Sequence, residues 1–377
     1  MKKCRILSLS DLHLGHYRVP SSVLVERLMT YVMPYLPETD LFCLSGDVFD
    51  RSLHLTDTDT RDIISWILDV LKIANDYNVH VRVLRGTFSH DRDQPSIFKT
   101  LYEKYGFTND VKYVDTLSIE YIKDLDIKML YLPDDLPYSS SEACLETVHQ
   151  LMTDAHWKHV DYAMCHGYFY HVLPPNIPSL PKVTFRADQF SFVSRYVLCG
   201  HIHEQSAYGH ILYNGSFDRL AHNEESPKGF YYIEDDGKKA HIQFIENKDA
   251  STFHTIDVSL YDSPDEAISA YLEALKPCLY RKNSIHIRAV HPNSEIRNAL
   301  KSLTYKRYPY IAFSVKSPNL TKQEKEQTET TLPEDDLKYL SAPRRDALPD
   351  MITSFIQDLP ETLTRDRILH HLNTSDI

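Results

Sequence analysis

Short apolar runs and amphipathic stretches alternate along the first 250 residues of the chain. Buried strands are predicted at Cys4–Ser10, Asp40–Ser45 and His80–Leu84, because each is a compact apolar run bounded by polar residues. Between these runs, Ser22–Leu36 and Asp62–Asn78 carry apolar residues at helical spacing. This order predicts parallel strands that are joined by helical crossovers.

Strand patterns continue after the third predicted strand. They cover Val111–Ile122, Ile127–Leu132, Asp161–Cys165 and Tyr196–Cys199, and then Ala207–Tyr213, Gly229–Glu234 and Ala240–Glu246. The last three are expected to be antiparallel, and the final two are joined by the turn signal Asp235-Asp236-Gly237. So many strands in residues 1–250 predict an α/β domain in which two packed sheets are flanked by helices.

The remainder of the chain divides into three parts. Residues 251–316 predict a small α/β domain with the order strand, helix, strand, helix, strand. Its elements are Phe253–Ser259, Pro264–Leu275, Ser284–Val290, Ser294–Leu303 and Tyr310–Val315. Residues 317–336 are nearly devoid of apolar side chains and are expected to be a linker. Residues 337–377 regain helical periodicity and predict two amphipathic helices, which must dock on the body or on a partner.

Charge and composition restrict the classes of function. The chain has 53 acidic and 41 basic side chains and a net charge of −12, so it is a poor general binder of polyanions. If it handles nucleic acid, bound metal ions are the obvious local source of positive charge. No apolar run reaches the roughly 18 residues of a membrane span. The N-terminus lacks the apolar region of a secretory signal. The six cysteines form no CxxC pair, which favours reduced thiols in the cytoplasm.

Candidate metal ligands follow five of the predicted strands. They lie in the segments Asp11–His13, Gly46–Asp50, Gly86–Asp91, His166–Gly167 and Gly200–His203. Each segment alone could recur by chance, but ligands in α/β sheets gather beyond the carboxyl ends of strands, so together they predict one shared site. Carboxylate and imidazole groups suit divalent Mn, Fe, Zn or Co. An aspartate can bridge two such ions at about 3.5–4 Å, and the pair can hold a phosphate.

These segments carry a resemblance to a known family. The sequence reads DLHLGH at Asp11–His16, SGDVFDR at Ser45–Arg51, SHD at Ser89–Asp91, CHGYF at Cys165–Phe169 and GHIHEQ at Gly200–Gln205. It resembles the calcineurin-like metallophosphoesterases, and within them the SbcD-type nucleases of double-strand-break repair. The resemblance covers residues 4–234. It implies a two-sheet metallophosphoesterase sandwich, followed by a small capping domain and a helical tail that binds an ATPase.

The resemblance also implies roles for individual residues. The first metal would be held by Asp11, His13 and His203, and the second by His166 and His201, with Asp47 as the bridge. His90 would be the general acid for the leaving oxygen, and Asp91 would orient or tune it.

The third motif departs from the family pattern. The family's Gly-Asn-His-Asp here reads Gly-Thr-Phe-Ser-His-Asp, which is two residues longer. Ser89 stands in the place of the metal-binding Asn, and Thr87 or water could supply the oxygen instead. A hydroxyl is a weaker ligand than an amide carbonyl, so the second metal is expected to be the weaker one.

The function implied is that of a metal-dependent DNA exonuclease and endonuclease. Its cofactors would be two divalent ions, with Mn²⁺ expected and Mg²⁺ or Fe²⁺ as alternatives. Its partners would be DNA, an SMC-like ATPase of the SbcC type and a second copy of the chain, in the cytoplasm and away from membranes. Two other hypotheses stay open, namely a stand-alone nucleotide phosphodiesterase and a weakly active scaffold subunit.

Overall fold

A computed structural model describes residues 3–54, 56–173, 180–279 and 284–318. All helices and strands given below belong to one compact unit that ends at Ser317. The predicted linker at 317–336, beyond its first two residues, and the predicted helical tail at 337–377 lie outside the described residues. The described part is an α/β protein with mixed sheets and six α-helices.

The first six-stranded sheet has the order β14-β13-β1-β2-β3-β4. Its strands are β1 (Cys4–Leu9), β2 (Leu41–Ser45), β3 (His80–Leu84), β4 (Val111–Val114), β13 (Gly229–Asp235) and β14 (Ala240–Glu246). Strands β1 to β4 run parallel, while β13 pairs antiparallel with β1 and with β14. The predicted parallel core and the predicted final hairpin are both confirmed.

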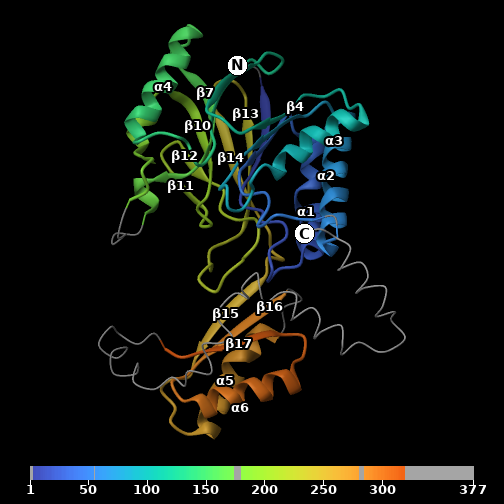
Figure 1. The fold of residues 1–377 in the computed structure, drawn as a ribbon, viewed down its shortest axis with the longest axis vertical. Coiled ribbons are helices and arrows are strands. Elements are labelled where there is room, and N and C mark those ends of the chain that lie inside the picture. Colours follow the sequence, from blue (N-terminus) through green and yellow to red (C-terminus); the bar gives the residue numbers. More distant parts are fainter. Residues whose placement is uncertain (1–2, 55, 174–179, 280–283, 319–377) are drawn as a thin grey trace, which may run out of the picture. The chain divides into compact units, whose positions relative to one another are not determined.

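Three helices cover the outer face of this sheet (Figure 1). They are α1 (Ser21–Tyr31), α2 (Thr58–Asp76) and α3 (Ile97–Tyr105). Helix α2 buries a stripe that includes Ile63, Trp66 and Val70, which pack with Leu7, Leu9 and other residues of the sheet. Burial of this stripe fixes the face that the helix turns to the sheet.

The second six-stranded sheet has the order β11-β12-β10-β7-β6-β5. Its strands are β5 (Ser118–Ile122), β6 (Ile127–Leu132), β7 (Val160–His166), β10 (Val193–Gly200), β11 (Ser206–Tyr208) and β12 (Ile211–Tyr213). Helix α4 (Ser141–Asp154) packs on its outer face, opposite the side of the molecule that carries α1 to α3 (Figure 1). Strands β8 (Tyr168–Phe169) and β9 (Thr184–Phe185) form a small separate sheet.

The inner faces of the two large sheets pack against each other. Their shared core contains Ile6, Leu41 and Ile233 of the first sheet with Met129 and Met164 of the second. All of these side chains are buried. Helix, sheet, sheet and helix therefore form four layers, which agrees with the predicted pair of sheets flanked by helices.

Two predicted strands are in fact broken. Val111–Ile122 was expected to be one strand, but β4 belongs to the first sheet and β5 to the second, so the chain changes sheets at residues 115–117. Ala207–Tyr213 is a hairpin of β11 and β12, with Gly209 at a φ of +60° between them. Four 3₁₀ helices complete the body, at Met33–Glu38, Gln94–Ser96, Tyr170–Val172 and Ala187–Phe190.

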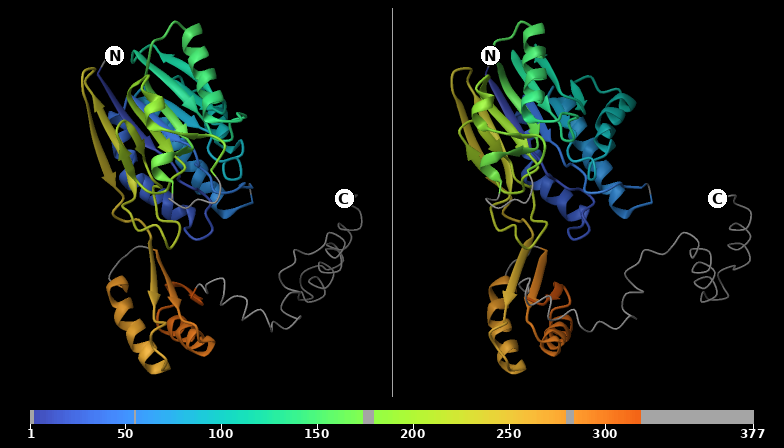
Figure 2. Two further views of the ribbon diagram at one scale, coloured as in Figure 1. Left: turned by 90° about the vertical axis from the view of Figure 1, so that its left-hand side faces the viewer. Right: turned by 60° about the vertical axis from the view of Figure 1, so that its left-hand side comes forward.

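The residues after β14 form a separate three-stranded parallel sheet with its own core. Its elements are β15 (Thr252–Asp257), α5 (Pro264–Leu279), β16 (Ile285–Val290), α6 (Ser294–Arg307) and β17 (Ala312–Lys316). Both helices pack on the same face of the sheet (Figure 2). The core includes Tyr271, Ile287 and Leu300. The predicted order of strands and helices is confirmed. Among the described residues, no helix combines the length and apolar character needed to cross a membrane.

Candidate metal centre

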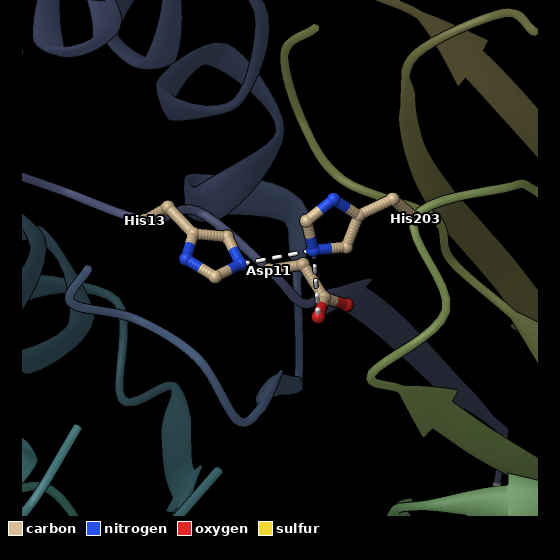
Figure 3. A group of neighbouring side chains, drawn as sticks. All are labelled: Asp11, His13 and His203. Carbon is tan, nitrogen blue, oxygen red and sulfur yellow. Dashed lines mark hydrogen bonds and ion pairs between the residues drawn. The ribbon is translucent and has the colours of Figure 1, made fainter. Parts of the chain in front are cut away.

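A first cluster of potential ligands joins the loop after β1 to the loop after β10. Asp11, His13 and His203 offer ligand atoms that all lie within 4.8 Å of one another. The Nε2 atoms of His13 and His203 are 3.0 Å apart, and His203 Nε2 is 3.9 Å from Asp11 Oδ1. Figure 3 shows the two rings turning these nitrogens toward each other above the carboxylate. The three residues that the sequence assigned to one metal are therefore brought together.

A second cluster lies beside the first and contains Asp47, His166 and His201. Asp47 Oδ2 is 3.3 Å from His166 Nε2 and 3.8 Å from His13 Nε2 of the first cluster. The Asp47 carboxylate thus reaches both groups, as a bridging ligand would.

The backbone of the ligand loops is held in unusual conformations by bonds between the loops. Asp11, His13 and Asp47 have φ angles between 47° and 52°, and His201 has a φ of 87°. Such angles are strained for residues other than glycine and persist where the surroundings enforce them. Here the N–H groups of Asp11 and His13 donate to the carbonyls of Gly46 and Asp47, each at 3.0 Å. The loops after β1 and β2 therefore position each other.

The main chain at Gly46 packs closely against the ring of His166 and so fixes the position of this ring. This residue has a φ of +87°, and a Cβ atom there would lie 2.2 Å from Nδ1 of His166. Only glycine lets the loop after β2 pass so close to the imidazole ring at the end of β7.

Hydrogen bonds orient three of the imidazole rings. His166 Nδ1 donates to the carbonyl of Ser45 at 2.7 Å, and His13 Nδ1 donates to Asp50 Oδ1 at 3.2 Å. His203 Nδ1 donates to Glu224 Oε1 at 2.9 Å. Each bond places a proton on Nδ1 and turns Nε2 toward the cluster, which is the orientation typical of metal-binding histidines.

Glu224 is itself fixed by a buried cation. Lys228 is 1% exposed, and its Nζ lies 3.0 Å from Glu224 Oε2 and donates to the carbonyl of His203 at 2.7 Å. Burial opposes ionisation of the carboxyl, but the bond from His203 and the Lys228 charge lower the pKa of Glu224 to about 2. The side chain stays an anionic acceptor for His203.

The charges within the second cluster are strongly coupled. Burial alone would raise the pKa of the Asp47 carboxyl, yet His166 and His13 hold it well below its ordinary value. Burial alone would lower the pKa of His166, yet Asp47 raises it well above its ordinary value. For His201, burial and the neighbouring His166 lower the pKa. Because an ionised carboxylate and a neutral imidazole are the forms that bind cations, a metal ion would have to displace the proton that Asp47 stabilises on His166.

The third motif forms a tight turn that separates its side chains. The N–H groups of His90 and Asp91 both donate to the carbonyl of Thr87 at 2.9 Å. In this turn Asp91 is buried and His90 is half-buried, whereas Ser89 is exposed. In the described part of the chain no hydrogen bond reaches the Ser89 side chain, and the structure does not bring Ser89 to either cluster. The hydroxyl of Thr87 lies beside the second cluster instead, at 3.3 Å from Asp47 Oδ2.

His90 stands at the edge of the first cluster. Its Nδ1 donates to the main-chain carbonyl of Asp50 at 2.9 Å, and its ring packs edge-on against His13. The His90 side chain is 38% exposed, so it can reach a bound substrate.

Asp91 has partners other than the predicted one. Its Oδ2 accepts the N–H groups of Asp47 at 3.0 Å and Gly86 at 2.8 Å, and its Oδ1 accepts that of Phe49 at 2.9 Å. No hydrogen bond between Asp91 and His90 exists among the described residues. Burial and the nearby Asp47 carboxylate raise the pKa of Asp91 to about 7. Asp91 therefore ties together the loops after β2 and β3.

Two residues of the centre were not assigned a role from the sequence. Asp50 lies within a quoted motif, but nothing in the pattern showed that it contacts both His13 and His90. Glu224 lies in a loop without periodic pattern. No sequence signal marked it, since the burial of Lys228, which requires a carboxylate partner, is visible only in the structure.

A cavity of about 790 Å³ opens beside the centre. It is lined by both His201 and His203 and by Glu204, Glu224 and Glu225. Without bound cations such an acidic lining would repel a phosphate. No protein-family model matches the chain, and no curated protein matches its sequence. Inferences about its chemistry therefore rest on the motifs and on this geometry.

Proposed function

We propose that the chain is a metal-dependent phosphodiesterase that cleaves DNA, as the SbcD-type nucleases that it resembles do. The observation that carries the proposal is the meeting of six predicted ligands, from the ends of four separate strands, in two adjacent clusters that share one carboxylate. These ligands are Asp11, His13, Asp47, His166, His201 and His203.

The donor set fits a pair of divalent cations. Each cluster combines at least one carboxylate with two imidazoles, and no thiolate takes part. This favours Mn²⁺, with Fe²⁺ or Mg²⁺ as alternatives, over a purely structural zinc site. When bound, such ions would hold a phosphate group and lower the pKa of a water molecule for attack.

The protein's own contribution to the cleavage would come from His90. Its Nδ1 proton is committed to the carbonyl of Asp50, and the Asp50 carboxylate lies 3.9 Å from the same nitrogen. The protonated Nε2 can then deliver its proton to the oxygen that leaves the phosphate.

The substrate and the partners come from the motifs. The DLHLGH segment at Asp11–His16 favours DNA, and the predicted helices at 337–377 favour docking to an SMC-like ATPase. A homodimer is part of the same proposal. The cavity beside the centre could instead hold one nucleotide, so hydrolysis of small nucleotides is the rival function.

The first test is metal analysis of the purified protein, followed by assays with Mn²⁺ on long linear DNA and on cyclic nucleotides. Cleavage of DNA alone supports the proposal, and cleavage of cyclic nucleotides alone supports the rival. Metal content near zero, with the ATPase still bound, would identify a scaffold.

The second test is His90→Ala, which should lower DNA cleavage by roughly 10²–10⁴-fold because a positioned proton donor is lost. Metal content should not change. His159→Ala is the matched control, because His159 is also partly exposed but lies at the other end of β7. A loss of metal from the His90 variant would show that this histidine is a ligand, and unchanged cleavage would remove its role as the acid.

A further inference from the structure

The hydroxyl of Thr87 occupies the open side of the second cluster. It lies 3.3 Å from Asp47 Oδ2, 3.5 Å from His166 Nε2 and 3.3 Å from His201 Nδ1. Its oxygen is thus nearly equidistant from all three ligand atoms of that cluster.

These separations match the ligands of a single cation. Two donor atoms at about 2.1 Å from one ion lie roughly 3.0 Å apart in an octahedral arrangement and about 3.4 Å apart in a tetrahedral one. The distances from Thr87 Oγ1 fall at the tetrahedral end, and so does the 3.3 Å between His166 Nε2 and Asp47 Oδ2.

A hydrogen bond to Asp47 does not explain the position of the hydroxyl equally well. Bonds between a hydroxyl and a carboxylate are normally about 2.5–2.8 Å long, well below 3.3 Å. The strong bond between these residues is made by the main chain, where Thr87 N–H donates to Asp47 Oδ1 at 2.6 Å. That bond anchors the loop and leaves the hydroxyl directed at the cluster.

We propose that Thr87 Oγ1 is the fourth protein ligand of the second metal ion. The proposal rests on the metal-dependent function argued above and assigns the oxygen that the longer third motif supplies. A neutral hydroxyl is a weaker donor than a carboxylate or an imidazole, so this ion binds less tightly than the first.

The test uses full-length protein freed of metal by chelation. Calorimetric titration with Mn²⁺ should resolve two binding steps in the wild type. Thr87→Val keeps the shape of the side chain but removes the oxygen, and should weaken only the second step, by at least about tenfold. Thr87→Ser retains the oxygen and should restore it. Ser89→Ala, in the same turn, is the matched control and should behave as the wild type.

Substitution with Co²⁺ gives a readout that does not depend on activity. The intensity of its visible absorption depends on coordination number, so loss of the Thr87 oxygen should change the spectrum of the second ion alone.

Three outcomes are decisive. If Thr87→Val binds two ions with wild-type affinity and spectrum, Thr87 is not a ligand, although the metal centre stands. If Ser89→Ala weakens the second step instead, the oxygen comes from Ser89. If the wild-type protein binds no Mn²⁺, the proposed function itself fails.

Discussion

The carboxylate of Asp91 could either tune His90 or hold two loops of the centre together, and one substitution can distinguish these roles. The sequence suggested that Asp91 tunes His90, whereas the structure shows it accepting three main-chain N–H groups in the loops after β2 and β3. It is completely buried, so no water can replace it as an acceptor. Asp91→Asn separates the two roles with a minimal change in shape.

The cost of this change can be worked out from the bonds. The single amide oxygen can keep the bonds to Asp47 and Gly86, but the amide NH₂ group then faces the N–H of Phe49. One buried donor is left without an acceptor, which costs about 1–3 kcal/mol. Because Asp47 is one of the tethered residues, Mn²⁺ affinity should also fall, by about 10–100-fold.

Urea denaturation in the presence of a chelator measures the stability without any contribution from metal. We expect the urea midpoint of Asp91→Asn to lie below that of the wild type. The midpoint of Asp93→Asn, an exposed control two residues away, should be unchanged. The reasoning would be refuted if Asp91→Asn kept the wild-type midpoint and metal affinity and changed only the pH dependence of cleavage. That result would return Asp91 to the role of tuning His90.

Three further expectations concern other parts of the molecule. Asp47→Asn should abolish Mn²⁺-dependent cleavage in a folded protein, since a neutral amide cannot bridge two cations; near wild-type turnover would argue against the shared carboxylate. Burial would raise the pKa of Glu120, but its ion pair with the buried Arg82 keeps that pKa below its ordinary value. Glu120→Gln should therefore be less stable than the wild type at pH 7. This difference should begin to shrink as the pH falls through the ordinary glutamate pKa of about 4.3 and vanish below the lowered pKa of the folded state; a difference that persists in strong acid would contradict the ion pair. Deletion from Leu337 onward should leave basal cleavage intact and abolish co-elution with the ATPase, and retained co-elution would show that residues 337–377 are not the docking segment.

The positions of the clustered side chains could be predicted because they depend on local and repetitive features. Buried parallel strands are short apolar runs, and the polar residues that end them, such as Asp11 and Asp47, must meet at one edge of the sheet. The histidines at 166, 201 and 203 follow the same rule from the second sheet. The grouping of these residues followed from their places at the strand ends, whereas their assignment to two metal ions came from the family resemblance.

The hydroxyl of the third motif that faces the second cluster could not be predicted in this way. In a tight turn, a shift of two residues moves a side chain from the inside to the outside, so the sequence could not distinguish Thr87 from Ser89. The partner of His203 was also beyond reach, because Glu224 approaches it through a loop without a pattern. The break at residues 115–117 was missed because half-buried edge strands show little contrast between apolar and polar positions.

Each cluster of the centre takes side chains from both large sheets. Asp11 and His13 meet His203, and Asp47 meets His166 and His201, across the boundary between the two layers. Bound cations would therefore link the two sheets, and a shift of one sheet relative to the other would disturb both metal sites at once. Since a ligand that binds only the native state raises its stability, the free energy of unfolding of the two packed sheets should rise with the concentration of free metal ions.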